Sequence, residues 1–269
     1  MPASNQDRVT IIAVREVPPH LSKEVFGAKM GALLEAFMAL PVCKKNVLKW
    51  DLVCCDFAFE DSDHPYLTLC QILPMPSLFD ASIRAIGFRE SQRHVLAVAK
   101  YEVLADPEFA RLVMEGDKEF GFCSSSSTFI ADVVSKIDGP GSANPARAFW
   151  ILKAPSRFSR EEFSHKLGGL VDRLLAMPNS QKTSQKHSMC IQSNTDTSLR
   201  RTDALLRGLG LPVPEPMVVL MTETKSLDDA IEFGADPAVK QLAAEATAEL
   251  EFHVNGVGFL GDVESKVKS

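Results

Sequence analysis

The chain has 269 residues, 45% of them hydrophobic and 24% charged, and carries a formal net charge of −6 at pH 7. This is the composition of an ordinary soluble globular protein, and its acidic balance argues against nucleic acid or anionic membranes as partners, since both attract clustered Lys and Arg. No apolar run reaches the ~18 residues of a membrane span, and residues 1–8 lack the apolar core of a secretory signal.

The first half of the chain alternates strand and helix patterns. Val9–Val14 is an apolar, β-branched run that predicts a buried strand. Ser22 can cap a following helix, whose apolar stripe should end before Pro41. The later elements expected in this half are strands at Val47–Phe59 and Ile83–Phe88, a helix at Gln92–Leu104, a helix after Ala105-Asp106-Pro107 and a strand at Phe120–Ser124.

The second half repeats this order after a Gly/Pro/Ser-rich stretch, Gly139–Asn144. A strand is expected at Ala148–Leu152, and Ser159 can cap a helix that stops before Pro178. The later elements expected here are strands at Ser188–Gln192 and Val218–Thr222, a short helix around Thr202–Leu209, a helix at Leu227–Phe233, a helix after Ala235-Asp236-Pro237 and a strand at Phe252–Val257.

Two blocks of sequence recur in the same order. Leu21–Cys54 lies without a gap on Phe158–Ile191 at an offset of 137, with 10 identities in 34 positions, where chance gives roughly 2. Glu102–Lys136 matches Glu232–Lys266 at an offset of 130. A repeat of this length indicates a duplicated domain. We therefore expect repeat domains at 8–138 and 147–266, joined by a linker at 139–146.

Each half then reads β-α-β-β-α-β, the split motif of ferredoxin-like domains. Such a unit has an antiparallel sheet with helices on one face only, so its bare face must be covered. The predicted fold class is α+β, with tandem ferredoxin-like repeats whose sheets pack on each other as an intramolecular dimeric α/β barrel.

The pattern resembles the dimeric α/β-barrel superfamily and, within it, the EthD-like domains. The resemblance rests on the Ser-x-Glu-x-Phe helix starts at Ser22 and Ser159, on the helix-ending prolines Pro41 and Pro178, and on the two Ala-Asp-Pro turns. It implies relatives that include cofactor-free decarboxylases, cyclases, isomerases and monooxygenases of aromatic or polyketide-like compounds, haem enzymes, and proteins with no known reaction. The EthD histidine is absent from both first helices, so no catalytic residue is carried over.

The six cysteines show no repeated C-x-x-C pattern, which predicts buried thiols in a reducing compartment, the cytoplasm. P-loop, G-x-S-x-G, H-E-x-x-H and acidic calcium-loop motifs are also absent. The sequence therefore predicts neither a zinc or other metal site nor a phosphate-binding loop.

The last predicted strand of the second half supplies the candidate catalytic residues. If Phe252 and Val254 face the helices, alternation places His253 and Asn255 in the barrel interior. An imidazole with the ordinary pKa of about 6.5 suits general acid/base catalysis. The alternative is a structural or partly exposed histidine.

Four further residues are candidates for substrate binding. Trp150 could line a cavity for an aromatic ligand, or it could pack in the core. His187 stands where the first half has Trp50, on a strand face that suits core packing. Arg15 could bind a carboxylate or form a rim salt bridge. Asp51 lies within an apolar strand, where it could be a buried acid/base group or a strand-end residue in water.

The leading hypothesis is a cofactor-independent lyase, cyclase or isomerase acting on a hydrophobic aromatic or polyketide-like compound. His253 would transfer the proton, and Asn255 and Trp150 would shape the pocket. The alternatives are a non-catalytic ligand-binding or stress-responsive protein, and a haem enzyme with His187 or His253 as axial ligand. Whether two chains associate further into a homodimer stays open.

Overall fold

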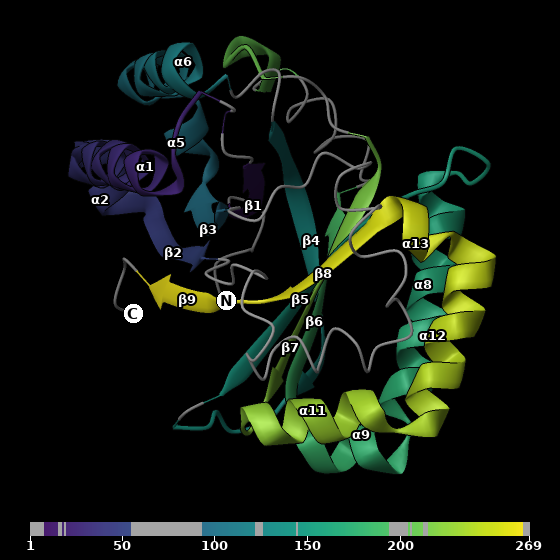
Figure 1. Cartoon of the computed structure of the whole chain (residues 1–269). Helices are drawn as coiled ribbons and strands as arrows, with labels where there is room; N and C mark the ends of the chain where they lie inside the picture. Colours follow the sequence, from purple (N-terminus) through teal and green to yellow (C-terminus); the bar gives the residue numbers. More distant parts are fainter. Residues whose placement is uncertain are drawn as a thin grey trace, which may run out of the picture.

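A computed structural model describes residues 8–15, 18, 20–54, 93–121, 126–143, 145–193, 204, 206–211 and 215–265. The chain forms a mixed α+β fold around one curled antiparallel sheet, whose strand order is β8-β5-β7-β6-β4-β1-β3-β2-β9. Figure 1 shows helices α1, α2 and α6 on one side of this sheet and α8, α9, α11 and α12 on the other. No helix in these ranges is long and apolar enough to cross a membrane.

The elements of the first half are β1 (Arg8–Arg15), α1 (Lys23–Ala39), α2 (Pro41–Asn46), β2 (Val47–Cys54), β3 (Arg93–Lys100), α5 (Tyr101–Leu104), α6 (Pro107–Phe120) and β4 (Ser126–Asp138). Those of the second half are β5 (Ala146–Lys153), α8 (Arg160–Leu175), α9 (Pro178–Thr183), β6 (Ser184–Gln192), β7 (Met217–Thr224), α11 (Leu227–Ala235), α12 (Pro237–Leu250), α13 (Phe252–Asn255), β8 (Gly256–Leu260) and β9 (Asp262–Ser265). Both halves therefore follow the predicted alternation of strands and helices.

The helix starts form for the local reasons that the sequence predicts. The Ser22 hydroxyl accepts a hydrogen bond from the Val25 N–H, and Ser159 forms a reciprocal capping box with Glu162. Both caps satisfy backbone N–H groups that have no partner within the helix. Asp106 and Asp236 cap α6 and α12 in the same way, each before a proline in the first turn.

Three predicted elements are corrected by the structure. Most of the helix predicted at Gln92–Leu104 is strand β3, because this segment pairs along its length with both β1 and β2; only α5 is helical. The strand predicted at Phe120–Ser124 begins later, at Ser126. The strand predicted at Phe252–Val257 begins at Gly256, after the helical turn α13. The strand predicted at Ile83–Phe88 lies outside the described residues.

The register of the strand pairs follows the sequence offsets. Ala13 of β1 pairs with Thr128 of β4, and the pair Trp150–Gly258 of β5 and β8 lies 137 and 130 residues further along the chain. A bulge in β2 after Val47 recurs in β6. Other features recur at the same offsets: the ion pairs Lys29–Glu119 and Lys166–Glu249, and the left-handed residues Gly121 and Glu251 that end α6 and α12.

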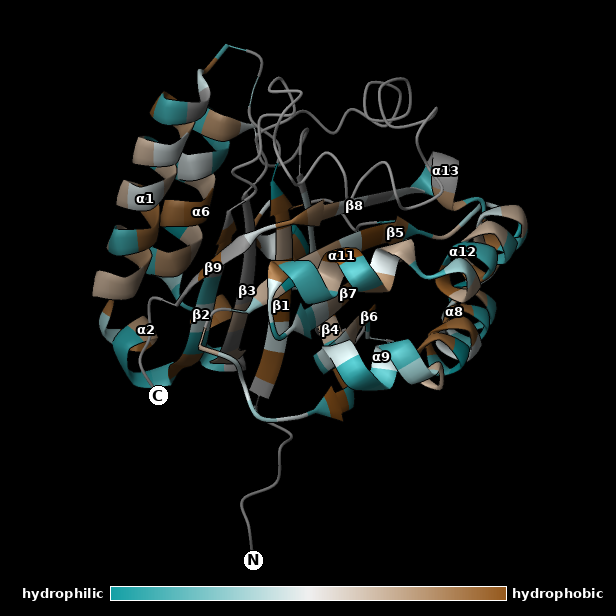
Figure 2. Cartoon of the chain, turned by 60° about the horizontal axis from the view of Figure 1, so that its bottom comes forward, coloured by the Kyte–Doolittle hydropathy of each residue, from teal (hydrophilic) through white to brown (hydrophobic). Residues whose placement is uncertain are grey.

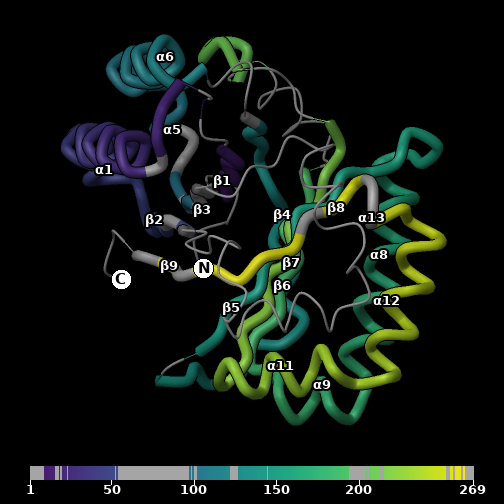
Figure 3. Tube along the Cα trace, viewed as in Figure 1, coloured from purple at the N-terminus to yellow at the C-terminus, as the bar shows by residue number. Residues whose placement is uncertain are grey.

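The two halves are joined by strands that cross from one half to the other. The first part of β4 pairs with β1, and its second part pairs with β6 from Ala131 to Asp138. In the second half the chain passes from β8 through Gly261 into β9, which pairs with β2. Figure 3 shows this last segment running from α13 across to β2. Because β8 and β9 hold the two ends of the strand order, this segment connects the ends of the curled sheet.

Buried side chains form three clusters, which matches a sheet covered on both faces. One cluster lies inside the curled sheet and contains residues of both halves, among them Ile12, Phe129, Phe149 and Val219. The other two lie between the sheet and the helices of each half. Figure 2 shows hydrophobic strands at the centre and helices with both hydrophobic and hydrophilic residues around them. Burial of the inner sheet faces against each other stabilises the contact between the halves.

Glu251 gives a test of backbone conformation. Its φ of 54° lies in the left-handed region, where the corresponding first-half residue is Gly121 with φ 61°. Since a side chain is strained there, we expect Glu251→Gly to raise the free energy of unfolding by about 1 kcal/mol. Urea denaturation measures this change. Gly121→Ala is the matched control and should lower stability by a similar amount; equal stability of all three proteins would contradict the expectation.

Candidate functional site

A cavity of about 80 Å³ lies between the sheet and the helices of the first half. Strands β1 to β4 form one wall, and α1, α5 and α6 form the opposite wall. A third wall comes from the second half, where Leu206, Leu209 and Leu211 cover the cavity. Apart from Arg15 and Thr128, the described lining consists of aliphatic and aromatic residues. Such an apolar space with a few polar atoms is the usual form of a small-molecule site.

Two polar atoms in this wall have no hydrogen-bond partner among the described residues. They are the indole Nε1 of Trp50 and the hydroxyl Oγ1 of Thr128, on side chains that are both buried. A buried donor that makes no hydrogen bond costs roughly 1–3 kcal/mol. Such groups are therefore rare in native proteins unless water or a ligand satisfies them. Both residues line the cavity, but Trp50 lies on β2 and Thr128 on β4, which are separated by β3 and β1 in the sheet. A bound molecule with an acceptor atom at either position would satisfy the group there.

Arg15 adds a positive charge to this wall. It ends strand β1 and lines the cavity, and it is the only titratable side chain among the described lining residues. A guanidinium stays charged at any physiological pH and offers several donors in one plane. The position fits the predicted role of binding an anionic group, and that role remains a prediction.

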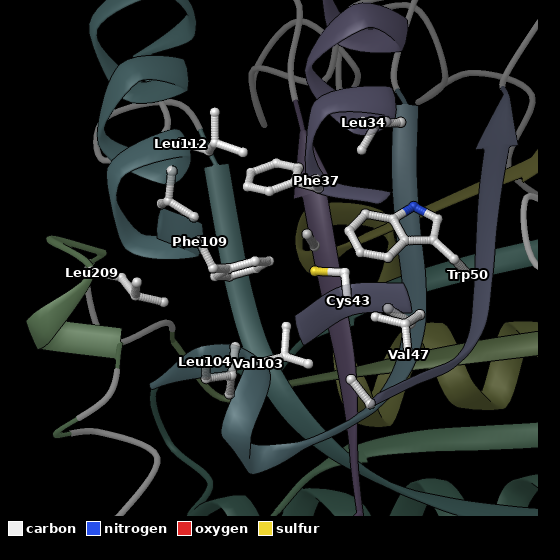
Figure 4. Close-up of a cluster of buried hydrophobic side chains, with 14 of the residues drawn as sticks. Leu34, Phe37, Cys43, Val47, Trp50, Val103, Leu104, Phe109, Leu112 and Leu209 are labelled. Carbon is white, nitrogen blue, oxygen red and sulfur yellow. The ribbon is translucent and has the colours of Figure 1, made fainter. Parts of the chain in front are cut away.

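Three aromatic rings line the cavity, and Figure 4 shows them within the cluster of buried hydrophobic side chains. The Phe37 ring lies 6.2 Å from the Trp50 ring and 4.9 Å from the Phe109 ring, measured between centroids. Cys43 lies in the same cluster. Burial, together with the negative charge of Asp106, raises the pKa of its thiol to about 11. The thiol is therefore neutral near pH 7 and does not act as a nucleophile.

Small residues explain why the first half has space here. Ala13 and Ala97 line the cavity, and the strand registers place Trp150 and Thr222 at the corresponding positions of the second half. The Trp150 indole lies against Gly258, where an added Cβ would be 2.7 Å from Cδ1 and Nε1 of the ring. Trp150 in the second half thus stands at the position of Ala13, which lines the cavity in the first half.

Trp150 therefore packs against the helix-side core of the second half. The sequence had offered core packing and a cavity wall as alternatives for this residue. The structure packs it, partly buried, against the core of the second half, and it does not line the cavity of the first half.

His187 is also buried in the second half, with 1% of its surface exposed. Its Nδ1 lies 2.8 Å from the Thr222 hydroxyl, and its Nε2 has no partner among the described residues. Burial, with a smaller effect from the positive charge of Lys136, lowers the pKa of the imidazole to about 4. The ring is therefore neutral near pH 7. It stands at the position of Trp50 in the other half and does not line the cavity.

Asp51 lies on the opposite face of β2 from Trp50, towards the barrel interior. Its side chain is 4% exposed, and its carboxylate lies 2.8 Å from the Lys49 Nζ. Val53, two residues further along, belongs to the cluster inside the sheet. Asp51 is therefore a buried ion-pair partner outside the cavity, rather than a strand-end residue in water.

The strand geometry proposed for His253 and Asn255 is wrong. Both belong to α13, a helical turn that follows the left-handed Glu251, so strand alternation does not aim them together into the barrel. The Asn255 side chain donates instead to the Glu251 carboxylate, over 3.5 Å. The side chain of His253 lies outside the described residues. Neither residue is among those that line the first-half cavity.

Sequence reasoning missed Trp50, Thr128 and the leucines of the second half as lining residues. A signal existed in the repeat alignment, which sets Ala13 against Trp150 and Trp50 against His187. Within the described ranges, no group of three or more His, Cys, Asp or Glu side chains could hold a metal ion.

No protein-family model matches the sequence, and no curated protein matches it. Among solved structures, an anthrone oxidase-like protein superimposes with a TM-score of 0.52 at 10% identity, covering 98% of this chain and 95% of that one. The chain has a dimeric α/β-barrel fold. A candidate monooxygenase from Fusobacterium nucleatum covers 100% of this chain and 98% of its own at 9% identity, with a TM-score of 0.48. Identities this low show the fold and nothing of the chemistry.

The contact between Gly258 and Trp150 can be tested by substitution. A methyl group at Gly258 would meet the indole at 2.7 Å, so we expect Gly258→Ala to lower the free energy of unfolding by about 1–3 kcal/mol. The same change in a Trp150→Phe background should cost less, because the smaller ring leaves room. Chemical denaturation of the four proteins gives the coupling energy; strictly additive effects would contradict the contact.

The buried His187 predicts acid sensitivity. Its pKa is about 4 in the folded chain and about 6.5 when unfolded. The unfolded chain therefore binds a proton first as the pH falls, so stability is fully present above pH 6.5 and declines towards pH 4. Relative to His187→Gln, which does not titrate, the wild type should lose up to about 3 kcal/mol across this range. Parallel stability curves for the two proteins would contradict the assignment.

Proposed function

We propose that the chain is a cofactor-independent enzyme that binds a small hydrophobic aromatic compound with an acidic oxygen in the first-half cavity. The observation that carries this proposal is the pair of buried donors, Trp50 Nε1 and Thr128 Oγ1, in an apolar wall that also contains Arg15. A phenol or an enol has the matching features, namely an apolar ring and an oxygen that can become negative.

The chemistry follows from where the charge would form. Apolar walls exclude water, so donors that point at a developing oxyanion act more strongly than they would in solution. The Arg15 guanidinium would favour the ionised form of the ligand and lower its pKa. Trp50 would then donate to the anionic oxygen, Thr128 would meet a second polar group of the ligand, and the Phe37 and Phe109 rings would contact the aromatic part.

The described lining residues favour a reaction in which the ionised substrate reacts without a general acid or base from the protein. Lyases, cyclases and isomerases move protons between atoms and need a general acid or base. Arg15, the only titratable residue in the described lining, cannot serve as one. An electron-rich anion can instead react with dioxygen directly. The name of the anthrone oxidase-like neighbour is compatible with such an oxidation, which we place ahead of the cofactor-free lyase, cyclase and isomerase reactions expected from the sequence.

We also propose that the barrel is intramolecular and arose by fusion of two ferredoxin-like copies, 8–138 and 147–266, with a linker at 139–146. Equal strand registers, the repeated bulge and the repeated ion pairs at the two sequence offsets support this. The homodimer and the cytoplasmic location stay predictions of the sequence.

A non-catalytic ligand-binding protein is the second candidate function. The same cavity supports it, because no described lining residue is a general acid or base. A ligand that is retained chemically unchanged in the presence of dioxygen would favour this function. The haem alternative has less support, since His187 is enclosed beside Thr222 and does not line the cavity.

Replacing Trp50 by Phe tests the proposal, because it removes the N–H and keeps an aromatic ring. A charge-assisted hydrogen bond contributes about 1.5–3 kcal/mol, so we expect binding of 4-nitrophenol, followed by the absorbance of its phenolate, to weaken by roughly tenfold or more. Turnover of enolisable aromatic compounds, measured as dioxygen uptake with product analysis by mass spectrometry, should fall in parallel.

The matched control is Trp150→Phe, since the other tryptophan of the chain lies outside the cavity. It should leave binding and turnover unchanged. If both variants lose affinity and turnover equally, or if Trp50→Phe loses neither, the ligand binds outside this cavity.

A further inference from the structure

The wall formed by the second half is a compact leucine turn, Leu206–Leu211. Its leucines are buried, with 2%, 3% and 5% exposure at positions 206, 209 and 211, although they lie in the long connection between β6 and β7, residues 193–216. The Leu206 carbonyl accepts hydrogen bonds from the N–H groups of Leu209, at 3.1 Å, and Leu211, at 2.9 Å. Gly210 adopts φ 73°, a left-handed conformation that suits glycine. The turn therefore holds its leucines in fixed positions.

The leucine turn belongs to the hydrophobic core of the other half. Its three leucines join the first-half cluster that contains Phe37, Phe109 and Trp50. In Figure 4, Leu209 and Trp50 lie on opposite sides of this cluster, and the Phe37 and Phe109 rings lie between them. In the same view the Trp50 Nε1 lies on the Leu34 side of the indole, so the hydrocarbon end of a ligand bound there reaches Leu209 by extending past the Phe37 and Phe109 rings.

The size of the cavity limits what this hydrocarbon end can be. The space of about 80 Å³ is smaller than the roughly 150 Å³ of an engineered apolar cavity that binds benzene. A single aromatic ring therefore already requires the lining side chains to move, and a second fused ring requires a larger displacement of them. The rest of the described lining comes from strands β1 to β4, from helices α1 and α6 and from the short helix α5, whose backbones are held by their own hydrogen bonds.

We propose that the leucine turn determines substrate size, so that the first-half site accepts monocyclic aromatic compounds and excludes fused ring systems. This inference rests on the proposed function and deepens it. The second half thus contributes specificity to a site whose described polar groups belong to the first half. Leu209, opposite Trp50, is the principal specificity-determining residue.

Truncating Leu209 tests the inference. Binding of 4-nitrophenol, with one ring, is compared with binding of 4-nitro-1-naphthol, with two fused rings, by the absorbance of their anions. The wild type should prefer the single ring by roughly tenfold or more, the discrimination that a tight apolar pocket achieves. Leu209→Ala should remove or reverse this preference, with a change of roughly tenfold in the ratio of the two dissociation constants.

The control is Leu167→Ala, which truncates a leucine of 1% exposure in the helix-side core of the second half. It should cost similar stability and leave the ratio unchanged. Leu209→Val, a smaller truncation, keeps the test available if Leu209→Ala fails to fold, and should shift the ratio in the same direction.

The outcomes separate this inference from the proposed function. One outcome overturns the size limit and leaves the proposed function standing. In it, Trp50→Phe weakens binding, but the ratio of the dissociation constants for the one-ring and two-ring compounds is the same in the wild type and the Leu209 variants. A wild type that binds both compounds equally also overturns the size limit. Failure of both compounds to bind the wild type overturns the two proposals together.

Discussion

The fold depends on the burial of two bare sheet faces against each other. Each half carries its helices on one face of its strands, and the other face, with residues such as Ile12 and Phe149, meets its counterpart inside the curled sheet. Apolar burial supplies the attraction, and the strand exchange fixes the geometry, because β4 and the β8–β9 segment each pair with both halves. The helix-side spaces, including the cavity, are therefore set between rigid strands and packed helices.

Corresponding strand pairings with different side chains give the two halves different interiors. At corresponding positions of β1 and β5 the first half has Ala13 and the second has Trp150. The indole fits because Gly258 lies opposite it, where the first half has Thr128. Thr128 has space for its hydroxyl for the converse reason, since Ala13 across from it is small. Small side chains on β1 and β3 thus leave space in the first half where the second half has Trp150 and Thr222.

Local signals in the sequence predicted much of the fold. Serine and aspartate caps, prolines in first turns and apolar helix stripes act within a few residues, and they located α1, α6, α8 and α12. The segment Arg93–Lys100 was misread because its alanines favour a helix, whereas pairing with β1 and β2 on both edges makes it a strand. The turn at Glu251 was missed because a left-handed glutamate leaves no sequence signal.

The site was harder to predict, because a cavity is defined by side chains that are absent. His253 and Trp150 drew attention by their chemistry, whereas the cavity depends on the small size of Ala13, Ala97 and Ala99. The leucine turn could not be assigned to the first half from sequence, since its covering role follows from a contact between distant segments. The sequence signal of the cavity lies in the differences between corresponding positions, such as Ala13 against Trp150 and Trp50 against His187.

The segment β8–β9 also bears on how the chain acquires its fold. Strand β2 finds its outer neighbour only in residues 262–265, which leave the ribosome after every other described strand. Until then the edge of β2 offers unpaired backbone groups to other chains. Contacts between such distant segments also slow folding, so nascent or truncated chains ending before Asp262 would be the forms most exposed to self-association and to capture by chaperones.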